Sequence, residues 1–142
     1  MSRAKHLDTK PLVAALLVYA FASLFHHVHN ASFLAVYPNL PPSLSVLNAY
    51  AAWAAVTTIG VVGFVLLRLQ HIGPALLAFA IYGACGLDGL AHYIVADFSS
   101  HTPMMHASIL MEVVSGIVLI CLVAGTAVHA KRIGALRNER AL

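Results

Sequence analysis

Long apolar stretches that are almost free of basic residues constrain this chain more than any other feature of its sequence. Between residues 11 and 130 the only Lys or Arg is Arg68. Of the 142 residues, 61% are apolar and 9% are charged, whereas a soluble domain has about 25% charged residues. So few charges would not cover the surface of a soluble protein, and we therefore predict an integral membrane protein.

The apolar stretches divide into four segments, each long enough to cross a bilayer as an α-helix. Loops and turns that contain Pro, Gly and Ser separate them. We predict an all-α fold, a bundle of four transmembrane helices that forms a single domain over residues 1–142. The expected spans are residues 11–29, 45–69, 74–96 and 104–130.

The first span also resembles a signal peptide. It follows a basic segment and contains the small-x-small sequence Ala20-Phe21-Ala22, which is typical of a cleavage site after residue 22. Because the apolar run continues past this point to His29, we expect residues 1–22 to be retained as part of a transmembrane helix.

The positions of the basic residues predict the topology. All eight Lys and Arg side chains precede the first span, end the second or follow the fourth, and so fall on one side of the membrane: Arg3, Lys5, Lys10, Arg68, Lys131, Arg132, Arg137 and Arg140. By the positive-inside rule both termini are cytoplasmic, and the loops 30–45 and 97–103 face outward. The expected location is a bacterial inner membrane, with these loops in the periplasm, although an organelle membrane fits the same pattern.

Polar residues gather toward the outer ends of the spans. Six of the nine histidines lie there, on three different spans: His26, His27, His29, His92, His101 and His106. Asp88 and Glu112 lie deeper, about 12 Å below the ends of their helices at 1.5 Å per residue. An uncompensated carboxylate at this depth costs roughly 2.5–3.5 kcal/mol on insertion scales. Protonation, a histidine partner or a bound cation would relieve that cost.

The helical spacing predicts which of these side chains face each other. At 100° per residue, Asp88 and His92 share one face of the third span, whereas His106 points about 120° away from Glu112 on the fourth. A purely structural alternative is that Asp88 and His92 form an internal hydrogen-bonded pair.

Imidazoles and carboxylates that converge from several helices of a bundle predict a metal site. The predicted metal ligands are Asp88, His92, His26, His27, His106, His101 and Glu112. Such ligands suit copper, iron or zinc, and the thioethers of Met104 and Met105 favour copper. Glu112 and Asp88 are also the candidate catalytic residues, because a carboxylate can serve as a metal ligand or as a proton acceptor.

The sequence Asp88-xxx-His92, followed by His106, resembles the Asp-xxx-His…His copper site of the C subunit of the particulate methane and ammonia monooxygenases. The similarity is confined to residues 88–106, and the interval to His106 is one residue longer than in that family. The resemblance implies copper or iron, and oxidative chemistry.

Three functions remain open at this point. The first is a membrane metalloprotein that performs oxidative chemistry on an apolar substrate, or a subunit of a membrane oxidoreductase complex. The second is a non-catalytic copper carrier or sensor, for which Met104, Met105 and His106 would be a loading site. The third is an accessory subunit of a larger membrane complex, whose histidines are structural or bind a pigment or haem b. The haem ligands would be His26 and either His92 or His106.

The expected partners are the lipid bilayer and either other membrane subunits or a second copy of the chain. The basic residues are few and dispersed, and the sequence has no phosphate-binding loop. We therefore expect neither a nucleic acid nor a nucleotide as a partner.

Overall fold

A computed structural model describes residues 7–139, which form helices joined by short loops. The elements in order are α1 (Lys10–Ser32), α2 (Val46–Arg68), α3 (Ile72–Cys85), the 3₁₀ helix η1 (Gly86–Ala91), α4 (His92–Val95), the 3₁₀ helix η2 (Phe98–Ser100) and α5 (Pro103–Glu139). Within these residues four helical segments are long and apolar enough to cross a membrane: Lys10–Ser32, Val46–Arg68, Ile72–Val95 and Pro103–Arg132. The predicted all-α class with four membrane-length helices is confirmed.

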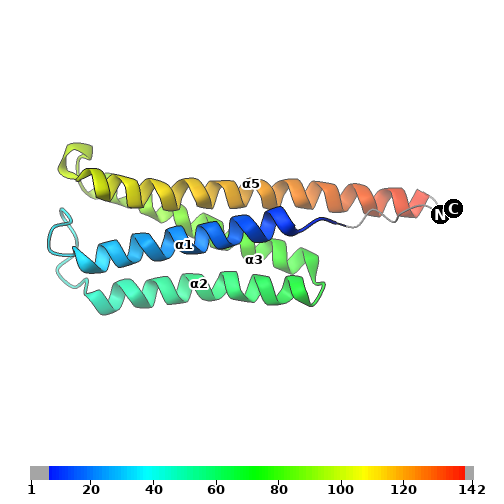
Figure 1. The fold of residues 1–142 in the computed structure, drawn as a ribbon, viewed down its shortest axis with the longest axis horizontal. Coiled ribbons are helices and arrows are strands. Elements are labelled where there is room, and N and C mark those ends of the chain that lie inside the picture. Colours follow the sequence, from blue (N-terminus) through cyan, green and yellow to red (C-terminus); the bar gives the residue numbers. More distant parts are fainter. Residues whose placement is uncertain (1–6, 140–142) are drawn as a thin grey trace.

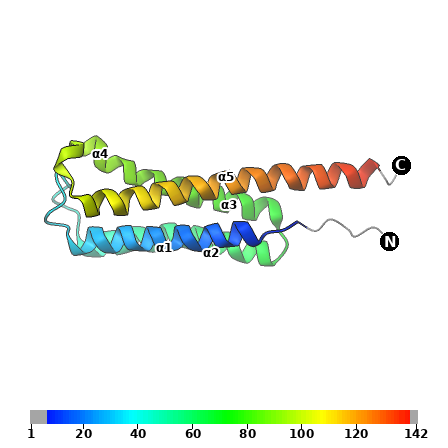
Figure 2. The ribbon, with the colours of Figure 1, turned by 45° about the horizontal axis from the view of Figure 1, so that its top comes forward.

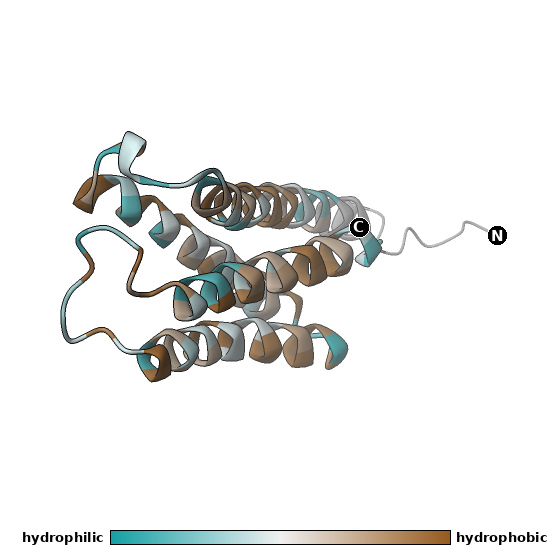
Figure 3. Cartoon of the chain, turned by 60° about the vertical axis from the view of Figure 1, so that its left-hand side comes forward, coloured by the Kyte–Doolittle hydropathy of each residue, from teal (hydrophilic) through white to brown (hydrophobic). Residues whose placement is uncertain are grey.

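The four long segments lie side by side and define two ends of the molecule (Figures 1 and 2). We call the end with the loop 33–45 and the turn 96–102 the loop end, and the opposite end the tail end. Helix α1 begins at the tail end, α2 turns into α3 there, and α5 extends beyond the other helices. Apolar residues occupy the middle of the helices, while hydrophilic residues concentrate toward the loops and helix ends (Figure 3).

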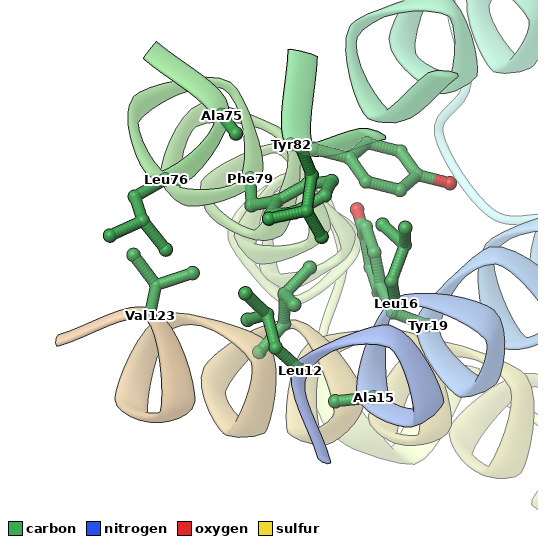
Figure 4. Packing of buried hydrophobic residues seen from close by; sticks show 11 residues of the cluster. Leu12, Ala15, Leu16, Tyr19, Ala75, Leu76, Phe79, Tyr82 and Val123 are labelled. Atoms are coloured by element: carbon green, nitrogen blue, oxygen red, sulfur yellow. The ribbon is translucent and has the colours of Figure 1, made fainter. Parts of the chain in front are cut away.

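The tail half of the bundle has an apolar core, to which α1, α2, α3 and α5 all contribute (Figure 4). Tyr19 of α1 meets Tyr82 of α3 edge to face, with ring centroids 4.5 Å apart. Phe79 and Leu119 are fully buried beside them. In a bilayer such packing holds helices together, because lipid removes the hydrophobic drive that operates in water.

Two glycines bring α3 and α5 into backbone contact. A Cβ atom on Gly116 would lie 2.6 Å from the carbonyl oxygen of Gly83, and a Cβ on Gly83 would lie 2.9 Å from that of Gly116. No side chain larger than hydrogen fits at this crossing, which is how small residues permit close helix association in membranes.

The third span is not the single α-helix that the spacing predicts. Helix α3 ends at Cys85, and residues 86–91 form a 3₁₀ helix before α4 begins. Gly86 and Gly89 weaken the α-helix here, and Gly86 packs so tightly that a Cβ would lie 2.7 Å from the Tyr19 ring. Because a 3₁₀ helix turns about 120° per residue, the 100° step used to place Asp88 and His92 on one face does not apply over residues 86–91.

This third span crosses the bundle obliquely. Helix α3 packs against both α2 and α5, whereas η1 packs against α5, and Figure 1 shows the span leaving α2 toward the loop end. The loop 33–45 lies over this end. Tyr37 from the loop is buried, and the Asn39 side chain donates a hydrogen bond to the Val95 carbonyl oxygen (2.9 Å). The loop is thereby tied to α4.

Candidate functional site

A buried carboxylate from α5 forms the centre of the loop end. Glu112 is only 3% exposed, and two neighbouring imidazoles of α1 approach its two oxygens. The Nε2 atom of His26 lies 3.6 Å from Oε2, and the Nδ1 atom of His27 lies 3.8 Å from Oε1. Both separations exceed a hydrogen bond, for which about 2.7–3.2 Å is usual. The carboxylate is therefore flanked by imidazoles without being hydrogen-bonded to them.

The orientation of His27 is fixed by the backbone of its own helix. Its Nδ1 lies 2.9 Å from the carbonyl oxygen of Ser23. Since a carbonyl can only accept, Nδ1 carries the hydrogen and Nε2 keeps its lone pair. Histidines that ligate metals usually donate their second ring N–H in this way.

Asn30, one helical turn after His26, lies between two imidazoles. Its Nδ2 atom is 2.9 Å from Nε2 of His26 and 3.4 Å from Nε2 of His92, which comes from α4. Nδ1 of His26, Nδ1 of His92 and Oδ1 of Asn30 are all buried without a hydrogen-bond partner. Buried polar atoms are nearly always satisfied, so this cluster has unused capacity to bind a ligand.

A cavity of about 290 Å³ opens beside this cluster. The charged and imidazole side chains that line it are His26, His27, Asp88, His92 and Glu112. The rest of its wall comes from α2, η1, α4 and the loop, and is largely apolar. Five of the seven predicted ligands therefore share one cavity.

Asp88 lies in this cavity but does not pair with a histidine. In the part of the chain that the structure describes, the carboxylate–imidazole contacts within 4.0 Å are those of Glu112. The predicted internal pair of Asp88 and His92 is therefore not formed. Asp88 is exposed, although it lines the same cavity as His92.

The other two predicted ligands, His101 and His106, do not line the cavity and belong to an aromatic cluster at the loop end, which adjoins His92 through the ring of His101 (centroids 6.3 Å apart). The Tyr93 hydroxyl lies 2.8 Å from Nδ1 of His106, and Phe98 stacks on the same imidazole with centroids 3.9 Å apart. His101 donates from Nδ1 to the Asp97 carbonyl oxygen at 3.1 Å. Its Nε2 is buried without a partner.

The two methionines of the predicted loading site have different surroundings. Met105 is buried, and its sulfur accepts a hydrogen bond from the Thr102 backbone N–H at 3.4 Å. Met104 is 54% exposed on the helix surface. The thioether argument for copper therefore has no geometric support.

Tyr37 is a residue of this region that the sequence did not indicate. Its hydroxyl lies 2.7 Å from Nδ1 of His29 and 3.5 Å from the Ser108 hydroxyl, so the loop is anchored to α1 and α5. Burial raises the pKa of the Tyr37 phenol above its ordinary value. Asn30 was also missed, although its four-residue spacing from His26 places both on one helix face.

The predicted haem ligands His26 and His92 lie close together, with ring centroids 5.4 Å apart in an edge-to-face arrangement. A haem held by both would need its plane between the two nitrogen ligands. The Asn30 amide fills the space between their Nε2 atoms.

Among residues 7–139, no set of three or more His, Cys, Asp or Glu side chains is arranged as a finished metal site. The chain also matches no known family model, no curated protein and no solved structure. Any function must therefore be argued from the geometry of the cavity and its lining.

Proposed function

We propose that this chain is a four-span membrane protein whose loop end faces outward, in the periplasm of a bacterium, and whose tail end is cytoplasmic. The support is the distribution of basic residues over the fold. Lys10, Arg68, Lys131 and Arg132 lie in elements that meet at the tail end or extend beyond it. The positive-inside rule assigns that end to the cytoplasm.

We further propose that the loop end holds a transition metal ion, with His26, His27 and Glu112 as ligands and His92 as a further donor. The observation that carries this proposal is the buried Glu112 carboxylate, which has Nε2 of His26 3.6 Å from one oxygen and the ring of His27, whose free lone pair is on Nε2, beside the other oxygen. No Lys or Arg occurs in the sequence between residues 69 and 130 to neutralise that carboxylate.

The spacing of the donors fits a shared ion better than a direct contact. Ligands that each lie about 2.1 Å from a tetrahedral ion are roughly 3.4 Å apart, close to the 3.6 Å between His26 Nε2 and Glu112 Oε2. Asn30 donates to the lone pair of His26 that the ion would use. Binding therefore requires the Asn30 amide to move aside.

Two imidazoles with one carboxylate are the ligand set of non-haem iron(II) oxygenases, in which other coordination positions stay open. The adjoining cavity is partly apolar and would admit an apolar substrate. We therefore favour iron and oxidative chemistry, alone or within a larger membrane oxidoreductase. Asp88, which lines the cavity without an imidazole partner, is the proton acceptor in this proposal.

The test is metal binding by the protein purified in detergent, stripped with a chelator and reloaded with Fe(II), Co(II), Zn(II) or Cu(II). We expect one ion per chain after dialysis, with a tetrahedral or five-coordinate Co(II) absorption spectrum. Glu112→Gln and His27→Ala should each lower affinity by about 10–100-fold or more, since each removes a ligand or its charge.

His29→Ala and His106→Ala are the matched controls, because neither side chain lines the cavity. Both variants should retain the ion. If stripped wild-type protein takes up no metal, or if His106→Ala loses it as readily as His27→Ala, the proposed site is wrong.

A further inference from the structure

We propose that the crevice between α2 and the η1–α4 segment binds a small amphiphile: an aliphatic alcohol that enters from the bilayer, with its hydroxyl at Asp88 and its chain along α2. This inference rests on the proposed function in treating the molecule as the substrate of the metal site. It adds the class of that substrate, its route of entry and the residues that select it.

The route follows from the path of the third span. This span packs against α2 near its start and against α5 through η1, so α2 and η1 diverge toward the loop end. The cavity lies in this divergence, with Ala49 and Ala52 of α2 on one side and Ala91 and Val95 on the other. Leu40, Pro41 and Leu44 of the loop contribute the remaining apolar wall.

The size of the cavity limits the length of the guest. An engineered apolar cavity of about 150 Å³ holds benzene, and this cavity has about 290 Å³. A molecule of roughly ten to twelve non-hydrogen atoms fills such a space. Ala49 and Ala52 leave this room because their side chains end at Cβ.

The polar groups of the crevice favour a hydroxyl. Asp88 is exposed there, has no imidazole nitrogen within 4.0 Å, and offers acceptors that require a donor. Asn48 also lines the cavity; its Oδ1 is bound to Ser45, which leaves its NH₂ group to donate. A hydroxyl both donates and accepts, so it matches this pair, whereas an alkane leaves both groups unsatisfied.

The experiment uses octanol that carries a photoreactive diazirine, added to the full-length protein in phosphatidylcholine nanodiscs. Peptides are mapped by mass spectrometry with and without excess octanol, so that only saturable labelling counts. We expect saturable labelling of the peptides that contain Ala49, Ala52 and Val95, and none from the corresponding diazirine octane.

Two substitutions on α2 separate the crevice from the lipid-facing surface. Ala52→Phe fills the cavity and should abolish saturable labelling, whereas Ala51→Phe, on an exposed position outside the cavity, should leave it unchanged. Asp88→Leu should raise the concentration for half-maximal labelling by roughly tenfold or more, as loss of a hydrogen bond to a charged group predicts.

Metal retention is measured in the same preparations, so that the two proposals can fail separately. Crevice labelling in a wild-type protein that binds no metal would uphold the alcohol-binding crevice but reject the metal site and, with it, the role of the alcohol as a substrate. Labelling spread evenly over all four spans, or equal labelling by the octanol and octane probes, would overturn the inference even if the metal site stands.

Discussion

The two halves of the bundle are built from the same helices, but the tail half buries mainly apolar side chains, whereas the loop half buries polar ones. In the tail half, Tyr19, Phe79 and Leu119 are fully buried, and Gly83 and Gly116 bring two backbones together. In the loop half, a carboxylate and several imidazoles are buried, some with no partner, beside a cavity. The contacts of the tail half stabilise the fold, whereas the buried polar groups and the cavity of the loop half lower its stability.

The difference indicates where a function resides. Sequences normally agree with their folds at every level, and the exceptions concentrate at functional sites. Here the broken third helix lies in the loop half, together with buried imidazole and amide atoms that have no partner and the cavity that Glu112 lines. We therefore expect overpacking in the tail half to destabilise the protein, whereas some substitutions in the loop half should stabilise it.

The largest effect is expected at the tight crossing of α3 and α5. Gly116→Val places a side chain where a single Cβ already lies 2.6 Å from the Gly83 carbonyl oxygen, and this should lower the free energy of unfolding by about 3 kcal/mol or more. Unfolding by SDS in mixed micelles measures the change. Gly125→Val is the control, since nothing lies within 4 Å of a Cβ there, and equal losses in both variants would contradict close packing.

The second expected effect has the opposite sign. Glu112→Met removes a buried carboxylate that no cation neutralises, and chelator-treated protein should gain about 2 kcal/mol of unfolding free energy. The same variant should lose metal binding. Equilibrium unfolding with and without metal measures both. A destabilised Glu112→Met protein would show that the carboxylate holds the fold together.

A smaller effect concerns the loop. Tyr37→Phe deletes the hydroxyl that contacts His29 and Ser108, at a cost of about 1 kcal/mol. Because burial raises the pKa of the folded Tyr37, the folded state holds the proton more tightly, so this tyrosine stabilises below pH 10.0 and loses that contribution as the pH rises further. Unfolding measured from pH 8 to pH 11 should therefore show a smaller alkaline loss in Tyr37→Phe than in wild type.

The smallest effect tests whether glycine in the 3₁₀ segment makes the protein less stable than alanine would. A Cβ on Gly89 would meet Val113 at 3.4 Å and Glu112 Oε2 at 3.6 Å, which are ordinary contacts. Gly89→Ala should therefore stabilise the protein by about 0.5 kcal/mol through the chain entropy of the unfolded state, as thermal unfolding would show. Gly86→Ala meets the Tyr19 ring at 2.7 Å and should destabilise; the reverse order would reject this account.

The sequence could predict the helical spans because their signal is local and strong. Long apolar runs bounded by polar turns leave a chain little choice, and the four helices follow them. The approach of His26 and His27 to Glu112 was accessible in outline, since counting residues from the helix ends places their depths near one another.

The remaining details depend on tertiary contacts that the sequence does not display. The third span breaks where Gly86 meets Tyr19, a residue 67 positions earlier in the chain. That break separates Asp88 from His92, whose four-residue spacing predicted a pair. The insertion of Tyr37 likewise depends on a loop path that carries no periodic signal.

The hydrogen bond from Asn39 to the Val95 carbonyl affects how often the rim of the crevice opens, as well as the shape of the crevice. It is the exposed link between the loop and α4 that the structure shows at this rim, and such a bond is worth about 1 kcal/mol net. At that strength the link is broken for roughly a sixth of the time, and loop motions of this kind take nanoseconds to microseconds. For the proposed guest, this means that entry would require a fluctuation of the rim, and that the residence time would depend on how soon the link reforms.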